Sequence, residues 1–316
     1  MKPVTTEDIK GLSIPSATSH KGQNGRLFII GGSHLFHAAS LWALTVASRI
    51  VDLVHYSSVP ENNELMLKIK SEFRDGIVVP RNDLDSYIKE DDCILIGPGM
   101  TRDNETKELT DGLLKKYPHK QWVIDAGALQ MMDISLIPKN AILTPHHGEF
   151  TTTFVDQPYF ANENFDPDFS FSREKPLADI GSSRRSQSES GQNFIGSPAG
   201  LETTPLPAAS LVESIAKKYH CIILLKGQED IACPPAGGCR VIEGGNVGMT
   251  KGGTGDVLAG LIAALACKND PFLATIAGSF INKQAGDTLY TRVGPYFNAS
   301  DLAHQIPLTM KELLLG

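Results

Sequence analysis

The chain has 316 residues, of which 41% are hydrophobic and 21% are charged, and its formal net charge is −7. This length provides one large domain or two small ones with an ample core. An acidic chain of this kind is not expected to bind nucleic acid through a general basic field, and no apolar run reaches the length of a membrane span.

The N-terminus and the cysteines bear on the cellular compartment. The first fifteen residues (MKPVTTEDIKGLSIP) are polar and lack the apolar core of a secretion signal. The five cysteines are an odd number, and we interpret them as free thiols of a reducing compartment. Cys233 and Cys239 have no second Cys/His pair nearby, so they predict a loop with two incidental cysteines rather than a zinc site. The sequence therefore predicts a cytoplasmic protein.

Short apolar runs alternate with helix-spaced stretches along the chain. A strand is expected at 26–30 (RLFII), before Gly31 and Gly32, and a helix at 38–54. Further strands are expected at 93–96, 122–124, 141–143 and 221–225, and a long apolar helix from about 257 to 266. Continuous apolar strands imply a sheet that is buried on both faces and therefore mostly parallel. Because ligands of open α/β sheets bind at the carboxyl ends of the strands, these five strand ends predict one crevice.

Residues from 156 to about 210 interrupt this pattern. They are rich in Ser, Pro, Asn, Gln and charged residues, and they show no sustained apolar period. We expect a long, irregular and removable insertion here, with a lid over the crevice as the alternative. The whole of residues 1–316 is otherwise expected to form a single domain.

The most informative motif is GMTKGGTGDVLAG at residues 248–260, where a glycine-rich turn leads directly into an apolar helix. Glycines allow successive backbone N–H groups to converge, and a helix N-terminus adds positive potential. The motif therefore predicts a cradle for a phosphate or an oxyanion. Asp256 at the helix mouth is expected to cap the helix, to accept a proton from a substrate hydroxyl, or to do both.

This motif resembles the GTGD motif of ribokinase-like kinases, and its longer form resembles the ADP/ATP-dependent NAD(P)H-hydrate dehydratase family. Other segments resemble the same family in the same order, namely HKGQNGR (20–26), IGPG (96–99), DAGAL (125–129), LTPHHGE (143–149) and LKG (225–227). The resemblance covers about 19–155 and 211–290. It implies an α/β, ribokinase-like fold with a mostly parallel central sheet flanked by helices, and a ligand crevice at the carboxyl ends of the strands.

The resemblance also implies site residues. The hydrated dinucleotide, NADHX or NADPHX, would contact Ala38, Gly99, His146 and Asp256, with Asp256 as the catalytic residue. ADP or ATP, accompanied by Mg²⁺, would bind at Lys226, Gly227, Gln228, Glu229, Asp230, Gly252, Gly253, Thr254 and Gly255. The implied activity is a carbon–oxygen lyase reaction that repairs hydrated NAD(P)H.

The residue types agree with this chemistry. Water leaves a hydrated nicotinamide ring more easily once its oxygen carries a phosphoryl group, and the glycine cradle would stabilise charge on that group during transfer. The lone pair of the ring nitrogen would then help to expel phosphate. A site with one clear carboxylate and no catalytic triad suffices for these steps.

Four residues depart from the family pattern. His37 stands where Gly is common, Gly127 replaces the second Asp of DADAL, Gln130 replaces Asn, and His147 replaces Pro in HPGE. We expect these changes to affect the pose of the dinucleotide more than the reaction type, because the nucleotide-phosphate motif is intact.

Several of these residues also have a structural interpretation. His146, His147 and Glu149 are metal-ligand types, but adjacent histidines point in different directions, so we expect His146 to make a hydrogen bond to substrate. Lys226 follows a buried strand at the crevice and is expected to contact ligand rather than solvent alone. Asp125 is expected either to hold its turn by accepting backbone N–H groups or to contact ligand.

Two other functions are compatible with the sequence. A ribokinase-like kinase for a sugar, hydroxymethylpyrimidine or hydroxyethylthiazole would use the same cradle and base, although HKGxxGR and LTPHxGE favour the dehydratase. A catalytically inactive nucleotide-binding regulator is compatible with Gly127 and Gln130, but it would not need Asp256. Only about twenty residues precede the first matched motif, so no N-terminal epimerase domain is expected. The resemblance also predicts a homo-oligomer.

Overall fold

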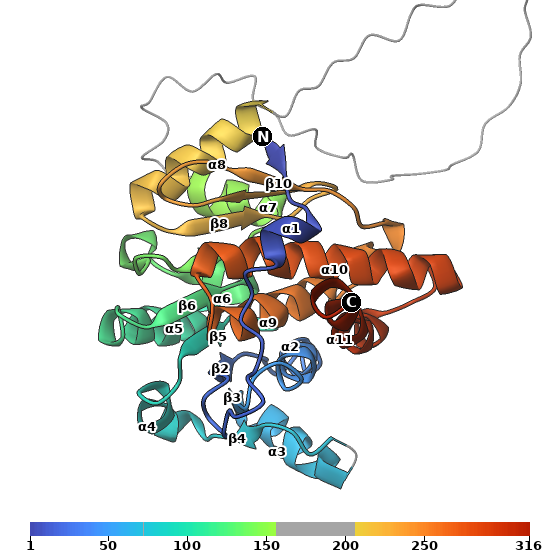
Figure 1. Ribbon diagram of the computed structural model, residues 1–316. Helices are drawn as coiled ribbons and strands as arrows, with labels where there is room; N and C mark the ends of the chain where they lie inside the picture. Colours follow the sequence, from blue (N-terminus) through green and yellow to red (C-terminus); the bar gives the residue numbers. More distant parts are fainter. Residues whose placement is uncertain (72, 156–205) are drawn as a thin grey trace, which may run out of the picture.

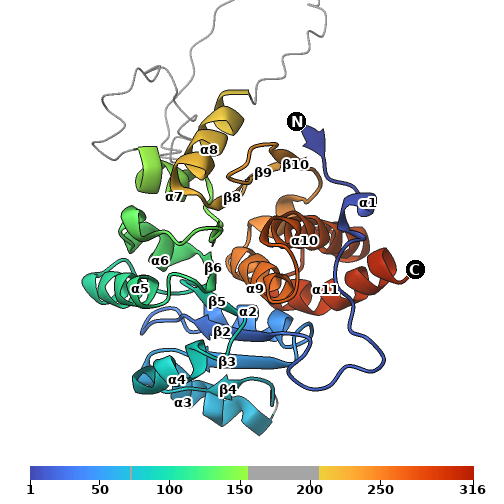
Figure 2. The same cartoon turned by 60° about the vertical axis from the view of Figure 1, so that its left-hand side comes forward.

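The computed structural model describes residues 1–71, 73–155 and 206–316. Within these residues one ten-stranded sheet runs through the molecule, and helices cover both of its faces (Figures 1 and 2). The strand order is β1-β10-β9-β8-β7-β6-β5-β2-β3-β4. The strands are β1 (Lys2–Pro3), β2 (Arg26–Ile30), β3 (Leu53–Ser57), β4 (Ile77–Val78), β5 (Cys93–Ile96), β6 (Gln121–Ile124), β7 (Ile142–Leu143), β8 (Ile222–Leu225), β9 (Asp230–Cys233) and β10 (Arg240–Ile242).

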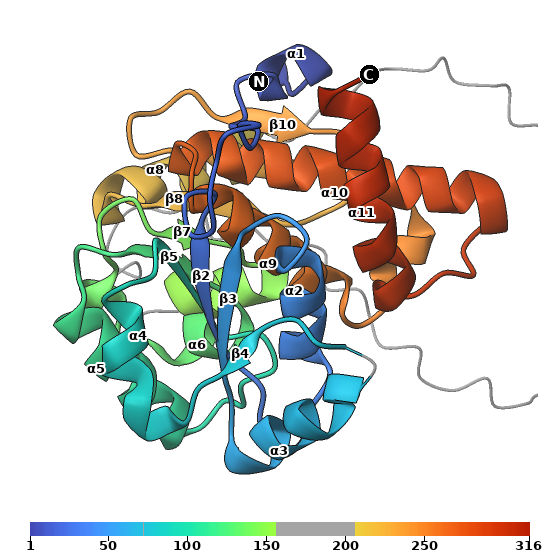
Figure 3. The ribbon, with the colours of Figure 1, turned by 60° about the horizontal axis from the view of Figure 1, so that its bottom comes forward.

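The helices form two layers. Helices α2, α9, α10 and α11 pack on one face of the sheet, and α4, α5, α6 and α8 pack on the other (Figures 2 and 3). The helices of the described residues are α1 (Thr6–Ile9), α2 (Ala39–Ala47), α3 (Pro60–Lys68), α4 (Leu84–Ile88), α5 (Asn104–Lys116), α6 (Ala126–Met131), α7 (His147–Phe150), α8 (Leu206–Tyr219), α9 (Thr254–Ala266), α10 (Pro271–Val293) and α11 (Ala299–Leu314).

Alternating side chains of the central strands build two separate cores. In β2, Leu27 and Ile29 point to the layer that contains α9, whereas Phe28 and Ile30 point to the layer that contains α5. All four side chains are fully buried, as expected for a strand that is covered on both faces. This explains why the strands are apolar without interruption.

The sheet is mostly parallel, as predicted. The five strands expected from the sequence are neighbours in the order β8-β7-β6-β5-β2, and every pair among them is parallel. Their carboxyl ends therefore lie along one edge. Strand β9 is antiparallel to both β8 and β10, so the regular pattern ends on that side of the sheet.

The expected helix at 38–54 is wrong in its second half. Helix α2 ends at Ala47, and the buried strand β3 begins at Leu53. Asp52 fixes the turn between them, because its carboxylate accepts the backbone N–H groups of Gly22 (2.7 Å) and Asn24 (3.0 Å). The apolar residues after Ala47 thus continue into a strand, which a periodicity argument merges with the helix.

The expectation of five free thiols is also wrong. Cys233 ends β9, and Cys239 lies just before β10; the two form a disulfide with their Cα atoms 4.3 Å apart. The antiparallel pairing of β9 with β10 brings the two residues together, and no local sequence pattern predicts this pairing. Cys93, Cys221 and Cys267 are free and buried. The cysteines therefore give no support to the cytoplasmic prediction.

The expected insertion at 156–210 lies mostly outside the described residues, so its interpretation stays a prediction. Its last five residues, however, belong to helix α8, which begins at Leu206. In this helix Ala209, Leu211 and Val212 are buried against the sheet, and this packing stabilises the helix. The polar composition of the preceding segment gives no indication that a helix begins here. Among the described residues, no helix is both long enough and apolar enough to cross a membrane.

Candidate active site

The glycine-rich motif forms the N-terminus of α9, beside the carboxyl ends of the central strands. Gly253 is the N-cap residue and has a φ of 97°, a conformation that side chains disfavour. A Cβ atom at Gly253 would lie 2.4 Å from ring carbons of Trp42, whereas a Cβ at Gly252 would meet nothing within 4 Å. The turn therefore depends on glycine at position 253, where the backbone passes directly over α2.

Asp256 lies in the first turn of α9 and is not its N-cap residue, so the capping role considered for it is not observed. Burial, followed by the negative charges of Asp125 and Glu149, raises its pKa to about 7 against the opposing charge of Lys226. A carboxyl group with this pKa exchanges a proton near neutral pH, as a general base requires.

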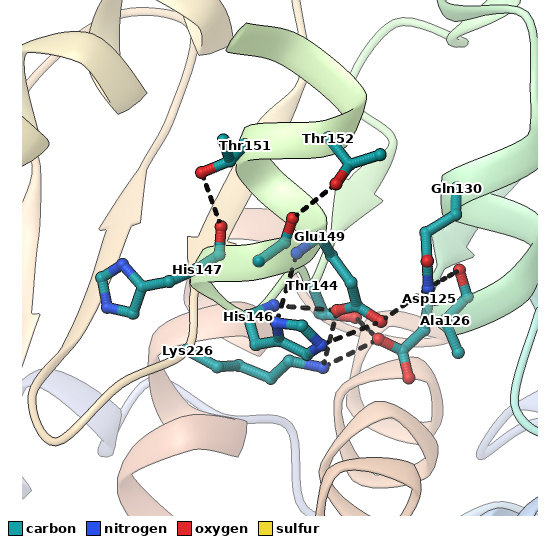
Figure 4. A network of polar contacts seen from close by, with 11 residues as sticks. Asp125, Ala126, Gln130, Thr144, His146, His147, Glu149, Thr151, Thr152 and Lys226 are labelled. Carbon is teal, nitrogen blue, oxygen red and sulfur yellow. Dashed lines mark hydrogen bonds and ion pairs between the residues drawn. The ribbon is translucent and has the colours of Figure 1, made fainter. Parts of the chain in front are cut away.

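An ion-pair network lies at the neighbouring strand ends (Figure 4), and its charges act on the pKa of Asp256. Lys226, directly after β8, places its Nζ 2.9 Å from Oδ1 of Asp125, directly after β6, and 3.9 Å from Oε2 of Glu149 in α7. The hydroxyl of Thr144, after β7, also donates to Oδ1 of Asp125 at 2.8 Å. Burial opposes the charge of Lys226, but the surrounding carboxylates outweigh burial and raise its pKa. The ammonium of Lys226 thus interacts with the carboxylates of Asp125, Glu149 and Asp256.

His146 and Glu149 close the first turn of α7 reciprocally. The backbone N–H of Glu149 donates to Nδ1 of His146 at 3.2 Å, and the backbone N–H of His146 donates to Oε2 of Glu149 at 2.9 Å. Nδ1 is an acceptor here, so a neutral His146 ring carries its proton on Nε2. His146 is exposed, and its Nε2 lies 3.6 Å from Oε1 of Glu149, whereas the ring of His147 points away from the network (Figure 4).

Two departures from the family pattern have a structural reason. A Cβ atom at Gly127 would lie 2.2 Å from the backbone oxygen of Met100, so no aspartate fits at this position. Gln130 turns inward, and its Nε2 donates to Oε1 of Glu149 at 3.1 Å and to the carbonyl of Ala126 at 3.3 Å. Gln130 thus contacts the network directly, and Gly127 allows the backbone of Met100 to lie close to α6.

The expected nucleotide-binding residues after β8 differ in their surroundings. Gln228 and Glu229 are exposed, but the carboxylate of Asp230 is buried and accepts the backbone N–H of Gly227 (2.9 Å) and the hydroxyl of Ser279 (2.7 Å). The buried carboxylate of Asp230 thus stabilises the loop that follows β8. Direct contact between this carboxylate and a nucleotide stays a prediction.

Lys283, in α10, is a residue that sequence reasoning missed. It is buried, and its Nζ donates to the carbonyls of Gln228 (2.8 Å) and Gly244 (3.1 Å). It lies 3.4 Å from Oδ1 of Asp230. A single side chain therefore joins the loop after β8 to the loop after β10, on the side of the cradle assigned to the nucleotide.

Two of the residues expected to bind the dinucleotide, Ala38 and Gly99, lie near α2 and the cradle, whereas His146 forms an isolated β-bridge with Lys226 in the network. Ala38 is the exposed N-cap residue of α2, and a Cβ atom at Gly99 would lie 2.9 Å from Cβ of Ala39. Trp42, one turn along α2, packs under Gly253. The start of α2, the turn after β5 and the cradle thus adjoin one another.

Gly255 adjoins the ion-pair network, since a Cβ atom there would lie 3.6 Å from Nζ of Lys226. Thr254 is buried, and its hydroxyl donates to the carbonyl of Met249 at 2.7 Å, so it stabilises the cradle from within. In the part of the chain that is described, no three His, Cys, Asp or Glu side chains are arranged to hold a metal ion.

A cavity of about 250 Å³ lies elsewhere in the molecule. Its walls come from the N-terminal segment and the carboxyl ends of α2, α9 and α11, including Ala264 and Leu265. Asp256 is at the amino end of the same helix α9, so this cavity is separate from the network that carries the titratable groups. The candidate site is the crevice at the strand ends.

The fold and the cradle define the class of the protein as ribokinase-like α/β. A solved ribokinase-like superfamily protein from Enterococcus faecalis superposes with a TM-score of 0.74 at 19% identity, over 100% of this chain and 97% of that chain. The ADP/ATP-dependent NAD(P)H-hydrate dehydratase from Bacillus subtilis, co-crystallised with ATP/Mg²⁺, superposes with a TM-score of 0.70 at 22% identity, over 99% and 98% of the two chains.

Sequence comparison defines the family within that class. The family model for NAD(P)H-hydrate dehydratase matches residues 27–163 and 206–308. The ADP-dependent (S)-NAD(P)H-hydrate dehydratase of Nitrosopumilus maritimus is 30% identical over 328 residues, which cover 98% of this chain and 97% of that protein. The chain therefore belongs to the NAD(P)H-hydrate dehydratase family.

Other relatives are longer. The bifunctional NAD(P)H-hydrate repair enzyme Nnr of Methanocaldococcus jannaschii is 32% identical over 314 residues, which cover 96% of this chain but 52% of that enzyme. The chain thus spans about half the length of the bifunctional relatives that it matches.

Proposed function

We propose that the protein is an ADP- or ATP-dependent dehydratase that regenerates NADH and NADPH from their hydrates, NADHX and NADPHX. The observation that carries the proposal is Asp256, a carboxyl group with a pKa of about 7 in the first turn of a helix whose N-terminus is a glycine cradle. The names of full-length and bifunctional relatives support this pair of substrates.

In the first step Asp256 accepts the proton of the hydroxyl group on the hydrated nicotinamide ring. The hydroxyl oxygen then bonds to the terminal phosphoryl group of the nucleotide, and the bond from that phosphorus to the leaving AMP or ADP breaks. Backbone N–H groups of the cradle stabilise the negative charge on the transferring group. A helix N-terminus contributes in the same direction.

In the second step the carbon–oxygen bond of the phosphorylated hydrate breaks, and phosphate leaves with the electron pair. The lone pair of the ring nitrogen compensates for the lost electrons, and transfer of a proton from the adjacent ring carbon to water restores the double bond. No second carboxylate is required as an acid, because phosphate is already a good leaving group. Asp256 releases its proton to complete the cycle.

Lys226 supplies the fixed positive charge of the site. Its ammonium is 2.9 Å from Asp125, and its charge lowers the pKa of Asp256. We propose that Lys226 binds the phosphates of the nucleotide, because its ammonium lies beside Gly255 in the cradle. A point charge in this position attracts phosphate and offsets part of the negative charge of Asp125, Glu149 and Asp256.

Mg²⁺ commonly binds through one or two carboxylates together with substrate phosphates, rather than in a cage made by the protein alone. The described residues offer no such cage, but Asp125 and Glu149 lie beside the proposed phosphate position. These residues fit a magnesium ion that arrives with the nucleotide, where it would neutralise charge on the phosphates.

Turnover of the hydrate tests the proposal. NADHX is incubated with the protein, Mg²⁺ and either ADP or ATP, and the recovery of NADH absorbance is followed. Nucleotide-dependent recovery supports the proposal, and parallel assays of hydroxyethylthiazole and hydroxymethylpyrimidine phosphorylation detect a kinase instead. Binding of ADP without turnover of either hydrate would indicate an inactive regulator. Light scattering after size-exclusion chromatography tests the predicted homo-oligomer.

A further inference from the structure

His37 occupies a defined position at the edge of the crevice. The loop that carries it is closed by two hydrogen bonds, from the N–H of Ser33 to the carbonyl of Phe36 (3.3 Å) and from the N–H of Phe36 to Oγ of Ser33 (3.1 Å). His37 directly precedes Ala38, the N-cap residue of α2, and its side chain is exposed. A Cβ atom at Gly99 would lie 3.1 Å from the carbonyl of Phe36. The residue thus adjoins both proposed dinucleotide contacts.

Asn62 holds the imidazole of His37 from behind. It is only 2% exposed, and its Nδ2 donates to the carbonyl of Ser33 (3.2 Å) and to Oγ of Ser58 (3.0 Å). A backbone carbonyl can only accept, so the amide orientation of Asn62 is fixed, and its Oδ1 must face Nδ1 of His37. Nδ1 of His37 therefore carries a proton.

This bond determines what the other ring nitrogen offers. The partner of His37 is the oxygen of a neutral amide, and in the neutral ring with the proton on Nδ1, Nε2 is a hydrogen-bond acceptor. His34, in the same loop, and Glu61, in α3, contact each other at 3.3 Å. His146, in contrast, offers a donor from Nε2, so the two histidines present opposite hydrogen-bonding groups.

We propose that His37 is a specificity residue whose Nε2 accepts a hydrogen bond from a hydroxyl or amide group of the hydrated dinucleotide. Asn62 is the positioning residue that fixes the tautomer of His37. This inference rests on the proposed function, and it assigns a role to a side chain that stands where the family commonly has glycine. The proposed contact is with the dinucleotide and not with the adenine nucleotide, which we assign to Lys226 and to the cradle at Gly255.

Three substitutions of His37 separate an accepting from a donating role. His37→Gln can place an amide N–H toward Asn62 and a carbonyl oxygen toward the crevice, so it retains the acceptor. His37→Lys retains only donors and a positive charge, and His37→Gly removes the side chain. His34→Ala is the matched control, because His34 is an exposed histidine of the same loop that is paired with Glu61.

The readouts are KM for NADHX, KM for the nucleotide and kcat, with thermal unfolding as a check of folding. We expect His37→Gly and His37→Lys to raise KM for NADHX about three- to tenfold, which corresponds to the loss of one hydrogen bond. His37→Gln should stay near the wild-type value, and kcat and the nucleotide KM should change little in all three variants.

An unchanged KM for NADHX in His37→Gly, with an active wild-type enzyme, would overturn this inference and leave the proposed function intact. Tighter binding by His37→Lys than by His37→Gln would also overturn it, because that order indicates an anionic contact. A wild-type protein that does not turn over NADHX with any nucleotide would instead overturn the proposed function, and the inference with it.

Discussion

The Nζ atom of Lys226 lies 2.9 Å from Oδ1 of Asp125, so one ion pair joins the ends of β8 and β6 across the intervening strand β7. Thr144, at the end of β7, donates to the same carboxylate oxygen and completes the connection. Three neighbouring strand ends thus contribute one polar side chain each. This pair places a positive charge beside Asp256 and an additional negative charge that raises the pKa of that base.

Asp256→Asn should lose most of its dehydratase activity while it retains nucleotide binding. The amide is nearly the same size as the carboxyl group but cannot accept the proton of the hydroxyl, and loss of a general base typically lowers kcat by about 10²- to 10⁴-fold. Steady-state kinetics and calorimetric titration with ADP check the two parts. Near-wild-type kcat in this variant would remove Asp256 from the mechanism.

The same substitution should stabilise the protein at neutral pH. Because burial raises the pKa of Asp256 from 3.8 to about 7, its ionisation is less favourable in the folded state than in the unfolded chain. The stability that the folded protein gains by keeping Asp256 protonated is fully present below pH 4 and is lost as the pH rises through 7. Asp256→Asn removes this pH dependence, so at neutral pH its free energy of unfolding should exceed that of the wild type by at most about 4 kcal/mol. Urea unfolding at pH 4 and pH 8 measures it. If the difference in the free energy of unfolding between Asp256→Asn and the wild type did not grow from pH 4 to pH 8, the raised pKa would be contradicted.

Asp125→Asn should shift the acid limb of the pH–rate profile to lower pH. Burial is the main cause of the raised pKa of Asp256, and the charge of Asp125 is the next. Removal of that charge lowers the pKa, and the active, ionised form of Asp256 then persists at lower pH. The profile of kcat against pH checks the direction, and a shift to higher pH would contradict it.

Thr144→Val is the matched control for Asp125→Asn. It removes the hydroxyl that donates to Oδ1 of Asp125 at 2.8 Å but leaves the charge of Asp125 in place. We therefore expect a smaller displacement of the acid limb in Thr144→Val than in Asp125→Asn. Equal displacements in the two variants would assign the effect to local packing instead of charge.

Gly253→Ala should impair both stability and nucleotide binding, whereas Gly252→Ala should change stability little. Position 253 has a φ of 97°, and a Cβ atom there would lie 2.4 Å from Trp42, but position 252 is exposed with open space around it. Backbone strain of this kind costs about 1–3 kcal/mol, before any displacement of the tryptophan is added. Thermal unfolding and ADP titration compare the pair, and equal stability would show that the turn adapts without strain.

The central part of the fold could be predicted from the sequence because it depends on local patterns. Each parallel strand is buried on both faces, so it appears as an uninterrupted apolar run, and the order of small and polar residues after the runs locates one sheet edge. The end of α2 at Ala47 could not be predicted in this way. The apolar residues beyond it belong to β3, and the turn is held by Asp52 through amide groups about thirty residues earlier in the chain.

The candidate site was predicted in part. The motif around Asp256 and the position of Lys226 at a strand end follow from local sequence, but the pairing of Lys226 with Asp125 spans 101 positions and has no local signal. The role of Glu149 had one such signal, because it lies three residues after His146 at a helix start, which is the spacing of a capping box. Gly127 could not be interpreted without the backbone of Met100 beside it.

The stoichiometry of NADH recovery tests the central claim most directly. NADHX is supplied in excess over a limiting amount of ADP, and both NADH absorbance and released phosphate are measured for the wild type and for Asp256→Asn. The account predicts one NADH and one phosphate for each ADP consumed by the wild type, and a rate that is about 10²- to 10⁴-fold lower for the variant. Recovery of NADH by the wild type without consumption of nucleotide, or a stable phosphorylated product without NADH, would contradict it.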